Sequence, residues 1–234
     1  MQFAAAASWI HKWLALVVGV QVVLWIVSGA FFAIYPIERV RSEHRIAETV
    51  AAPLDPAGLP APAEIAALLP SPPLRITYER GVRGEVLALA EFAEGAPALI
   101  DVGARRVISP LDEDAARQIA HAYVANAPAV REARLVTTET PEYRGALPAW
   151  RIAFEDREGL AVYVAADTGR VTARRSDLWR VYDALWALHI MDWRDHENFN
   201  NGLLIAASVL ALAMAIFGFV LIPYRFGWVR RRSD

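Results

Sequence analysis

A stripe of large side chains runs through residues 177–201, between a polar region and a long apolar run. Its members follow one another at alternating steps of three and four residues: Trp179, Tyr182, Trp186, His189, Trp193 and His196. Residues three and four apart share one face of a helix, so the spacing predicts a helix with aromatic rings and imidazoles on one side. Two roles suit such a face. A histidine could ligate haem iron with the rings as packing, or the Trp and Tyr rings could lie at a membrane–water interface.

A zinc or iron site is a further interpretation of the same histidines. His189, Asp192 and His196 fall at positions i, i+3 and i+7, and a carboxylate–imidazole pair at i, i+4 can hold such a metal. The commoner role of this pattern is salt bridging on a helix surface. In a regular helix the two histidines are about 10 Å apart along the axis, so they cannot ligate the same iron.

Two uncharged apolar stretches, residues 13–35 and 202–222, predict two transmembrane helices. Each is long enough for a hydrocarbon core of about 30 Å, which takes roughly 20 residues. The first could instead be a cleaved signal peptide, although it exceeds the usual apolar core of about 7–15 residues. Lys12 precedes the first stretch, and Arg225 and residues 230–232 follow the second. Short basic flanks stay cytoplasmic, so both termini are predicted inside and residues 36–200 outside.

The composition narrows the possible functions. The chain has 234 residues, is 56% hydrophobic and carries a net charge of −2, which argues against a nucleic-acid partner. It contains no cysteine, so disulfides and thiolate metal sites are excluded. It also lacks a Gly-x-Ser-x-Gly motif, a His-Glu-x-x-His motif and a Gly-rich nucleotide loop, which argues against a hydrolase. Without a flavin or nicotinamide domain, any electrons must come from a partner.

The region between the two stretches predicts two similar blocks of one helix followed by strands. A proline-rich linker precedes them at residues 51–62. Ser109 and Pro110 begin the second helix as cap and first position. The extended segments are 74–79, 85–92, 98–102, 130–137, 149–156, 160–166 and 170–175. Val86, Ala88 and Ala90 stand 64 positions before Trp150, Ile152 and Phe154, which indicates an internal repeat.

The second block resembles the PepSY domain. The resemblance is carried by a helix with an acidic start at 112–114, by Pro148-x-Trp150-Arg151-Ile152, by Tyr163-Val164 and by the turn Asp167-Thr168-Gly169-Arg170. The flanks resemble PepSY-associated transmembrane proteins. The matching positions are His11, Trp13, Ser28 and Gly29 around the first stretch, and Leu188, His189, Asn200 and Gly218 around the second.

Relatives in this family include inner-membrane reductases of ferric siderophores, in which histidines at such positions bind b-type haem. The resemblance therefore implies haem iron at His11 and His189, with His196 as a further cofactor-binding candidate. It also implies a role in iron uptake, with a flavin-containing electron donor or siderophore-uptake proteins as partners. Those reductases usually carry four or more membrane helices, and this chain has two. About 30 Å of hydrocarbon separates His11 from His189, so a homodimer or larger complex would be needed to pair each with its copy.

A non-enzymatic function stays open beside this one. The family resemblance also permits a membrane-anchored periplasmic module that binds peptides, restrains a peptidase or scaffolds a complex. If the protein is an enzyme, it is an oxidoreductase component, and haem content separates the two alternatives.

The predicted fold class is membrane α+β, with two transmembrane helices flanking an outer-face domain of tandem PepSY-like units in the bacterial inner membrane. The predicted segments are 1–35 (tail and first transmembrane helix), 36–62 (linker), 63–109 (degenerate repeat), 110–176 (PepSY-like domain), 177–200 (amphipathic interfacial helix), 201–223 (second transmembrane helix) and 224–234 (basic cytoplasmic tail). The residues predicted to contact lipid at the membrane interface are Trp13, Trp179, Tyr182, Trp186 and Trp193.

Overall fold

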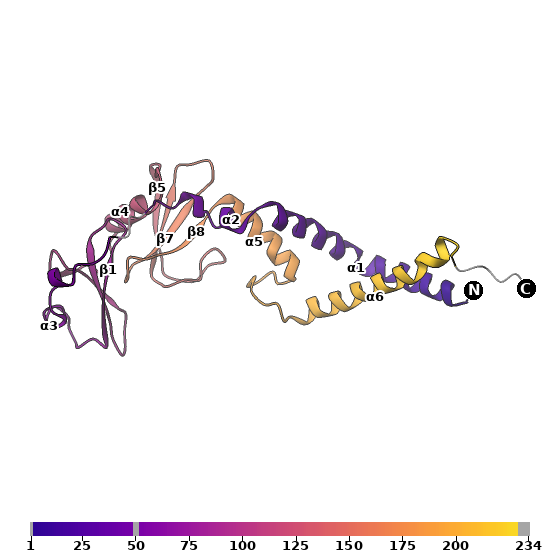
Figure 1. Ribbon diagram of the computed structural model, residues 1–234, viewed down its shortest axis with the longest axis horizontal. Coiled ribbons are helices and arrows are strands. Elements are labelled where there is room, and N and C mark those ends of the chain that lie inside the picture. The colour runs from indigo at the N-terminus through magenta and orange to yellow at the C-terminus, as the bar shows by residue number, and fades with distance from the viewer. Residues whose placement is uncertain (1, 49–51, 229–234) are drawn as a thin grey trace, which may run out of the picture. The chain divides into compact units, whose positions relative to one another are not determined.

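The computed structural model describes residues 2–48 and 52–228, and the chain divides into two compact units (Figure 1). The helical unit comprises residues 1–36 and 181–234, and the sheet unit comprises residues 37–180. Residues 229–234, most of the predicted basic tail, lie outside the described residues.

The helical unit contains two long apolar helices, α1 (Gln2–Ile34) and α6 (Gly202–Arg225), which lie side by side (Figure 1). Helix α1 begins well before the predicted span, because residues 4–7 are four alanines, the strongest helix former. It stops just before Pro36, which lacks the N–H needed to continue it. Both helices are long and apolar enough to cross a membrane.

The two long helices bury a narrow seam and expose apolar side chains elsewhere. Ala7 and Val18 of α1 and Ala207 of α6 are buried, which lets the backbones approach closely. Leu16, Val20 and many other aliphatic side chains remain exposed on the outer surfaces of these helices. A helix that is apolar all round requires either a protein core or lipid, and the exposed side chains favour lipid.

Helix α5 (Asp177–Ile190) is shorter than the helix predicted over 177–200, and the prediction beyond Ile190 is wrong. Met191 adopts a left-handed conformation with φ of 55°, which ends the helix. The Asp192 carboxylate then accepts backbone hydrogen bonds from Arg194, Asp195, Glu197 and Asn198. The bond from Asn198 and those from the other three lower the pKa of Asp192 to about 2. Residues 191–201 therefore form an organised loop that returns the chain to α6.

The sheet unit contains two antiparallel four-stranded sheets, each with its strands in chain order. The first holds β1 (Arg75–Arg80), β2 (Val86–Glu91), β3 (Ala98–Asp101) and β4 (Arg106–Val107), and it follows α3 (Pro62–Ala66). The second holds β5 (Val130–Val136), β6 (Ala149–Phe154), β7 (Ala161–Ala165) and β8 (Val171–Arg175), and it follows α4 (Glu113–Tyr123). Both blocks thus have one helix followed by a four-stranded meander.

The positions related by 64 residues lie on the second strand of each sheet and face the helix of their own block. Ala88 and Ala90 of β2 pack with Ile65 of α3. Ile152 and Phe154 of β6 pack in the core that contains α4. The opposite face of β2 joins that same core, so the two sheets share the packing around α4.

The predicted linker over 36–62 contains short helices and contacts with the second block. It contains α2 (Ile37–Val40) and two short 3-10 helices, η1 (Glu43–Arg45) and η2 (Pro56–Gly58). Ile46 pairs with Val124 in an isolated bridge, and the Arg45 guanidinium lies 3.0 Å from Asp156 and 2.7 Å from Glu158. These contacts hold the segment against the second block, whereas residues 49–51 lie outside the described part.

Candidate functional site

One face of α1 binds the C-terminal end of α5. Gln21 Nε2 donates to the Leu188 carbonyl at 3.2 Å, and Trp25 Nε1 donates to the His189 carbonyl at 2.7 Å. The last carbonyls of a helix have no partner within it, so these donors satisfy groups that α5 leaves free. Asn201 completes the set by donating to the Ile190 carbonyl at 2.9 Å. The end of α5 is therefore fixed at three successive carbonyls.

The His189 side chain is held by the same face of α1. Its Nδ1 lies 2.7 Å from the Ser28 hydroxyl, and its ring lies parallel to Trp186, with 6.4 Å between ring centroids and 4° between planes. Phe32 packs against the imidazole of His189, with 5.5 Å between the ring centroids. Burial lowers the pKa of the His189 imidazole, which favours the neutral ring.

His189 borders a cavity of about 460 Å³ with mostly apolar walls. The lining residues are Trp25, Trp186, His189, Ile190, Phe199, Leu204 and Ser208. Because Nδ1 is bound to Ser28, the other ring nitrogen, Nε2, is the one available to a ligand. No partner of Nε2 is found among residues 2–48 and 52–228.

His11 forms a second arrangement of the same kind between α1 and α6. Its Nδ1 lies 2.8 Å from the Met214 carbonyl. A carbonyl only accepts, so Nδ1 carries the proton and Nε2 carries the lone pair. Gly218 permits this approach, because a Cβ at that position would lie 3.0 Å from the Cε1 atom of His11.

The cavity beside His11 measures about 590 Å³ and has both apolar and polar walls. Its lining residues are Ala4, Ala5, Ser8, His11, Gly218, Leu221, Ile222, Tyr224, Arg225 and Phe226. His11 and Ser28 are 17 residues apart on one continuous helix, which corresponds to about 25 Å. The two histidines therefore lie at well separated levels of the helical unit, and one chain does not bring them to a common metal ion.

His196 does not join either arrangement. It lies beyond α5, has φ of 58°, and its Nδ1 lies 2.7 Å from an Asp183 carboxylate oxygen. Its carbonyl accepts from Trp186 Nε1 at 3.0 Å. The helical i, i+3, i+7 geometry of the zinc or iron alternative is absent because the helix ends at Ile190. Across the described ranges, no three His, Asp or Glu side chains are grouped so as to hold a metal ion.

The five rings predicted to lie at a membrane interface have different environments. Trp13 and Trp193 are about half exposed, and Trp13 contacts Trp9 edge-on at 6.3 Å. Tyr182 and Trp186 pack against Phe32 of α1. The remaining ring, Trp179, lies 4.0 Å from the guanidinium carbon of Arg175 in a cation–π contact. Four of the five rings thus contact another side chain of the protein, and Trp13 does so while about half exposed.

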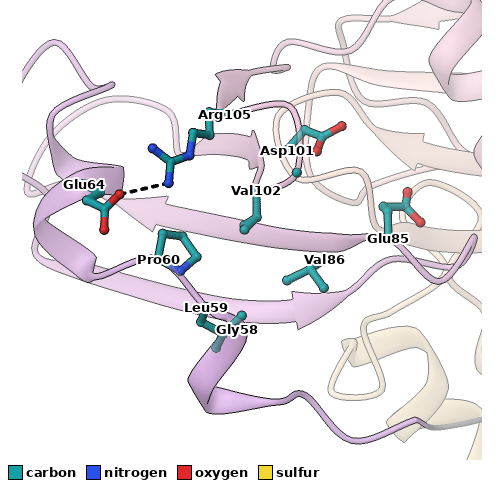
Figure 2. Close-up of a pocket in the computed structure, with 10 residues that line it drawn as sticks. Gly58, Leu59, Pro60, Glu64, Glu85, Val86, Asp101, Val102 and Arg105 are labelled. Atoms are coloured by element: carbon teal, nitrogen blue, oxygen red, sulfur yellow. Dashed lines mark ion pairs between the residues drawn. The ribbon is translucent and has the colours of Figure 1, made fainter.

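The sheet unit has a surface pocket of about 580 Å³ between η2, α3 and the first sheet (Figure 2). Its lining residues are Gly58, Leu59, Pro60, Glu64, Glu85, Val86, Asp101, Val102, Gly103 and Arg105. The three acidic groups all have partners: Glu64 pairs with Arg105 at 3.1 Å, Glu85 with Arg83, and Asp101 accepts from the Ala104 N–H. The pocket therefore contains no nucleophile–base pair and no free cluster of metal ligands.

His11 and His189 were candidates on sequence grounds, whereas Trp25 and Met214, which bond to them in the structure, were not. Trp25 follows Gln21 by four residues and precedes Ser28 by three, so the spacing of hydrogen-bonding side chains along the uncharged stretch 13–35 was a usable signal. The Met214 partner is a backbone carbonyl, and a sequence contains no signal for it.

Two apolar helices able to cross a membrane, with antiparallel sheets between them in the chain, define a membrane α+β protein. The chain belongs to the family described as the PepSY-associated TM region, whose model matches residues 8–234. No curated protein and no solved structure matches the chain.

Proposed function

We propose that this protein is a membrane electron-transfer component that binds b-type haem at His189 and at His11, and that it serves ferric-siderophore reduction in the bacterial inner membrane. One observation carries the proposal. Two histidines of the helical unit each have Nδ1 bound to an oxygen, and each keeps Nε2 available beside a cavity.

The residues around His189 fit half of a haem site. A haem requires an imidazole nitrogen for the iron, apolar walls and aromatic packing. His189 supplies the nitrogen, while Trp25, Phe199 and Leu204 supply the walls. An oxygen that accepts the other ring N–H strengthens an imidazole as a ligand, as in most metal-bound histidines. When bound, haem would supply one-electron transfer.

The residues around His11 fit a second half-site with a different polarity. Gly218 and Leu221 give it apolar walls, and Arg225 places a guanidinium at its border. A guanidinium pairs well with carboxylates, so Arg225 is suited to the acidic side chains of a haem. Each cavity offers a single histidine. A symmetric dimer, in which each histidine faces its copy, would complete both sites.

The topology that suits this function has both termini in the cytoplasm and residues 36–200 in the periplasm. The sheet unit then contains tandem PepSY-like units on the outer side, where a ferric chelate would accept electrons. A flavin-containing protein is the proposed electron donor on the inner side. A reporter that is active only outside the cytoplasm, fused after Ser176, tests this orientation. A cytoplasmic result would reject it.

The function is tested by the absorption spectrum of the full chain purified in detergent from haem-replete cells. A Soret band is expected, with haem content reduced by His189→Ala and by His11→Ala. His44→Ala and His121→Ala are matched controls, because both histidines belong to the sheet unit. A wild-type protein without a Soret band would reject the proposal and favour the non-enzymatic binding or scaffolding module.

A further inference from the structure

We infer that Ser28 is the positioning residue that sets which nitrogen of His189 carries the proton. The use of this tautomer in binding haem rests on the proposed function. The tautomer itself is a property of the protein without haem. Ser28 is 1% exposed, and its hydroxyl has three close neighbours. They are the Leu24 carbonyl at 2.7 Å, the Trp25 carbonyl at 3.3 Å and the His189 Nδ1 at 2.7 Å.

The single proton of the hydroxyl decides the assignment. A serine hydroxyl has one hydrogen to donate, and a backbone carbonyl can only accept. If the hydroxyl donates to the Leu24 carbonyl, His189 must donate its Nδ1–H to the hydroxyl oxygen, and both 2.7 Å contacts are hydrogen bonds. If the hydroxyl donated to Nδ1 instead, the Ser28 hydroxyl oxygen and the Leu24 carbonyl oxygen would lie 2.7 Å apart with no hydrogen between them. The first arrangement satisfies both contacts, and it places the lone pair on Nε2.

The rest of the environment fixes the ring without deciding its proton. Trp25 Nε1 bonds to the His189 backbone carbonyl, which positions the backbone. Trp186 lies parallel to the ring, which limits its rotation. Neither contact involves a ring nitrogen, so Ser28 alone distinguishes Nδ1 from Nε2 in the helical unit as described.

The two histidines reach the same tautomer by different means. His11 donates to a backbone carbonyl, which a substitution cannot remove. His189 donates to a side chain, so its tautomer can be changed by altering one residue. The ligand class that fits is a metal centre that binds a neutral imidazole through Nε2.

The test is ¹⁵N NMR of the haem-free full chain, labelled at histidine and reconstituted in lipid nanodiscs, with the His189 signals identified by their loss in His189→Ala. Wild type is expected to show one form of His189, protonated at Nδ1. Ser28→Ala is expected to lose this form or to mix it with the Nε2-protonated form. Ser28→Thr keeps the hydroxyl and should restore it. Ser208→Ala is the matched control, because Ser208 borders the same cavity without a hydrogen bond to His189.

A Ser28→Ala spectrum identical to wild type would overturn the inference. Ser28→Cys, which nearly preserves volume but bonds weakly, should behave as Ser28→Ala does and guards against a misfolded variant. Haem titration then separates the two proposals. A tautomer change in Ser28→Ala with no haem binding by wild type would refute the proposed function alone. If wild type binds haem and the His189 tautomer is unchanged in Ser28→Ala, the inference about Ser28 is refuted and the proposed function is not. If both hold, Ser28→Ala should weaken haem binding about tenfold or more, as loss of a partner behind a ligand typically does.

Discussion

Gly218→Ala should displace His11 and weaken any ligand that His11 binds. The added Cβ would lie 3.0 Å from Cε1 and 3.3 Å from Nδ1 of the imidazole, both shorter than ordinary van der Waals contact. The ring must therefore move by a few tenths of an ångström. Its Nδ1–H bond to Met214 is 2.8 Å, so the shift would bring that distance near the upper end of the hydrogen-bond range, about 3.2 Å.

The expected size of the effect follows from the weakened bond. A hydrogen bond of this kind contributes roughly 0.5–1.5 kcal/mol, which corresponds to about a twofold to tenfold change in affinity if most of it is lost. The added alanine also favours the helix by up to about 1 kcal/mol, which opposes any loss of stability. The substitution should thus reduce ligand affinity without unfolding the protein.

Haem titration of the full chain in nanodiscs, followed by the Soret band, measures the affinity, and ¹⁵N NMR of His11 measures the hydrogen bond. Gly29→Ala is the matched control, because its Cβ would meet nothing within 4 Å. Gly218→Ala should change the His11 signals and weaken one class of haem site, while the His189 signals stay as in wild type. Equal behaviour of the two variants in both assays would refute the packing argument.

Three further predictions concern other parts of the molecule. Trp25→Phe removes the donor to the His189 carbonyl and should destabilise the helical unit by about 1 kcal/mol in denaturant unfolding from mixed micelles; wild-type stability would contradict it. Asp192 has a folded-state pKa of about 2 against 3.8 in the unfolded chain, so it stabilises the folded loop above pH 3.8 and loses this effect as the pH falls through 2. Trp193 fluorescence should therefore stay constant down to about pH 4 and change below it, and Asp192→Asn should lack this acid step. Phe154→Ala should lower the free energy of unfolding by about 3–5 kcal/mol in thermal unfolding. Both sheets should unfold in one transition, because they share the core around Phe154, and separate transitions would contradict this.

The membrane helices and the strands could be predicted because periodicity and composition determine them. An uncharged run of sufficient length suits lipid whatever its neighbours are. Alternation of apolar and polar residues places Ile152 and Phe154 on one face of a strand, and the structure has them in the core. The start of α1 was harder to place, because polar residues at 11 and 12 interrupt the apolar pattern without interrupting the helix.

The end of α5 could not be predicted, because the stripe continues past it. Trp193 and His196 keep the helical spacing in sequence, but the backbone turns at Met191. The Asp192 carboxylate makes that turn favourable by accepting four backbone N–H groups, which a short polar side chain does better outside a helix than within it. Residue spacing alone does not show whether the backbone continues as a helix or turns to bond with the Asp192 carboxylate.

The polar side chains of α1 explain why α5 packs against it. Gln21, Trp25 and Ser28 lie on one face of the otherwise apolar stretch 13–34 of α1, and each bonds to α5. Without α5, the Gln21 amide and the Trp25 N–H would have to seek other partners in an apolar environment, where an unsatisfied group costs several kcal/mol. Ser28 donates its proton to the Leu24 carbonyl within α1 and needs no donor or acceptor from α5, so it is the one member of the three that loses little when α5 is absent. Gln21 and Trp25 therefore supply most of the preference for docking, and Ser28 is free to determine the chemistry of His189.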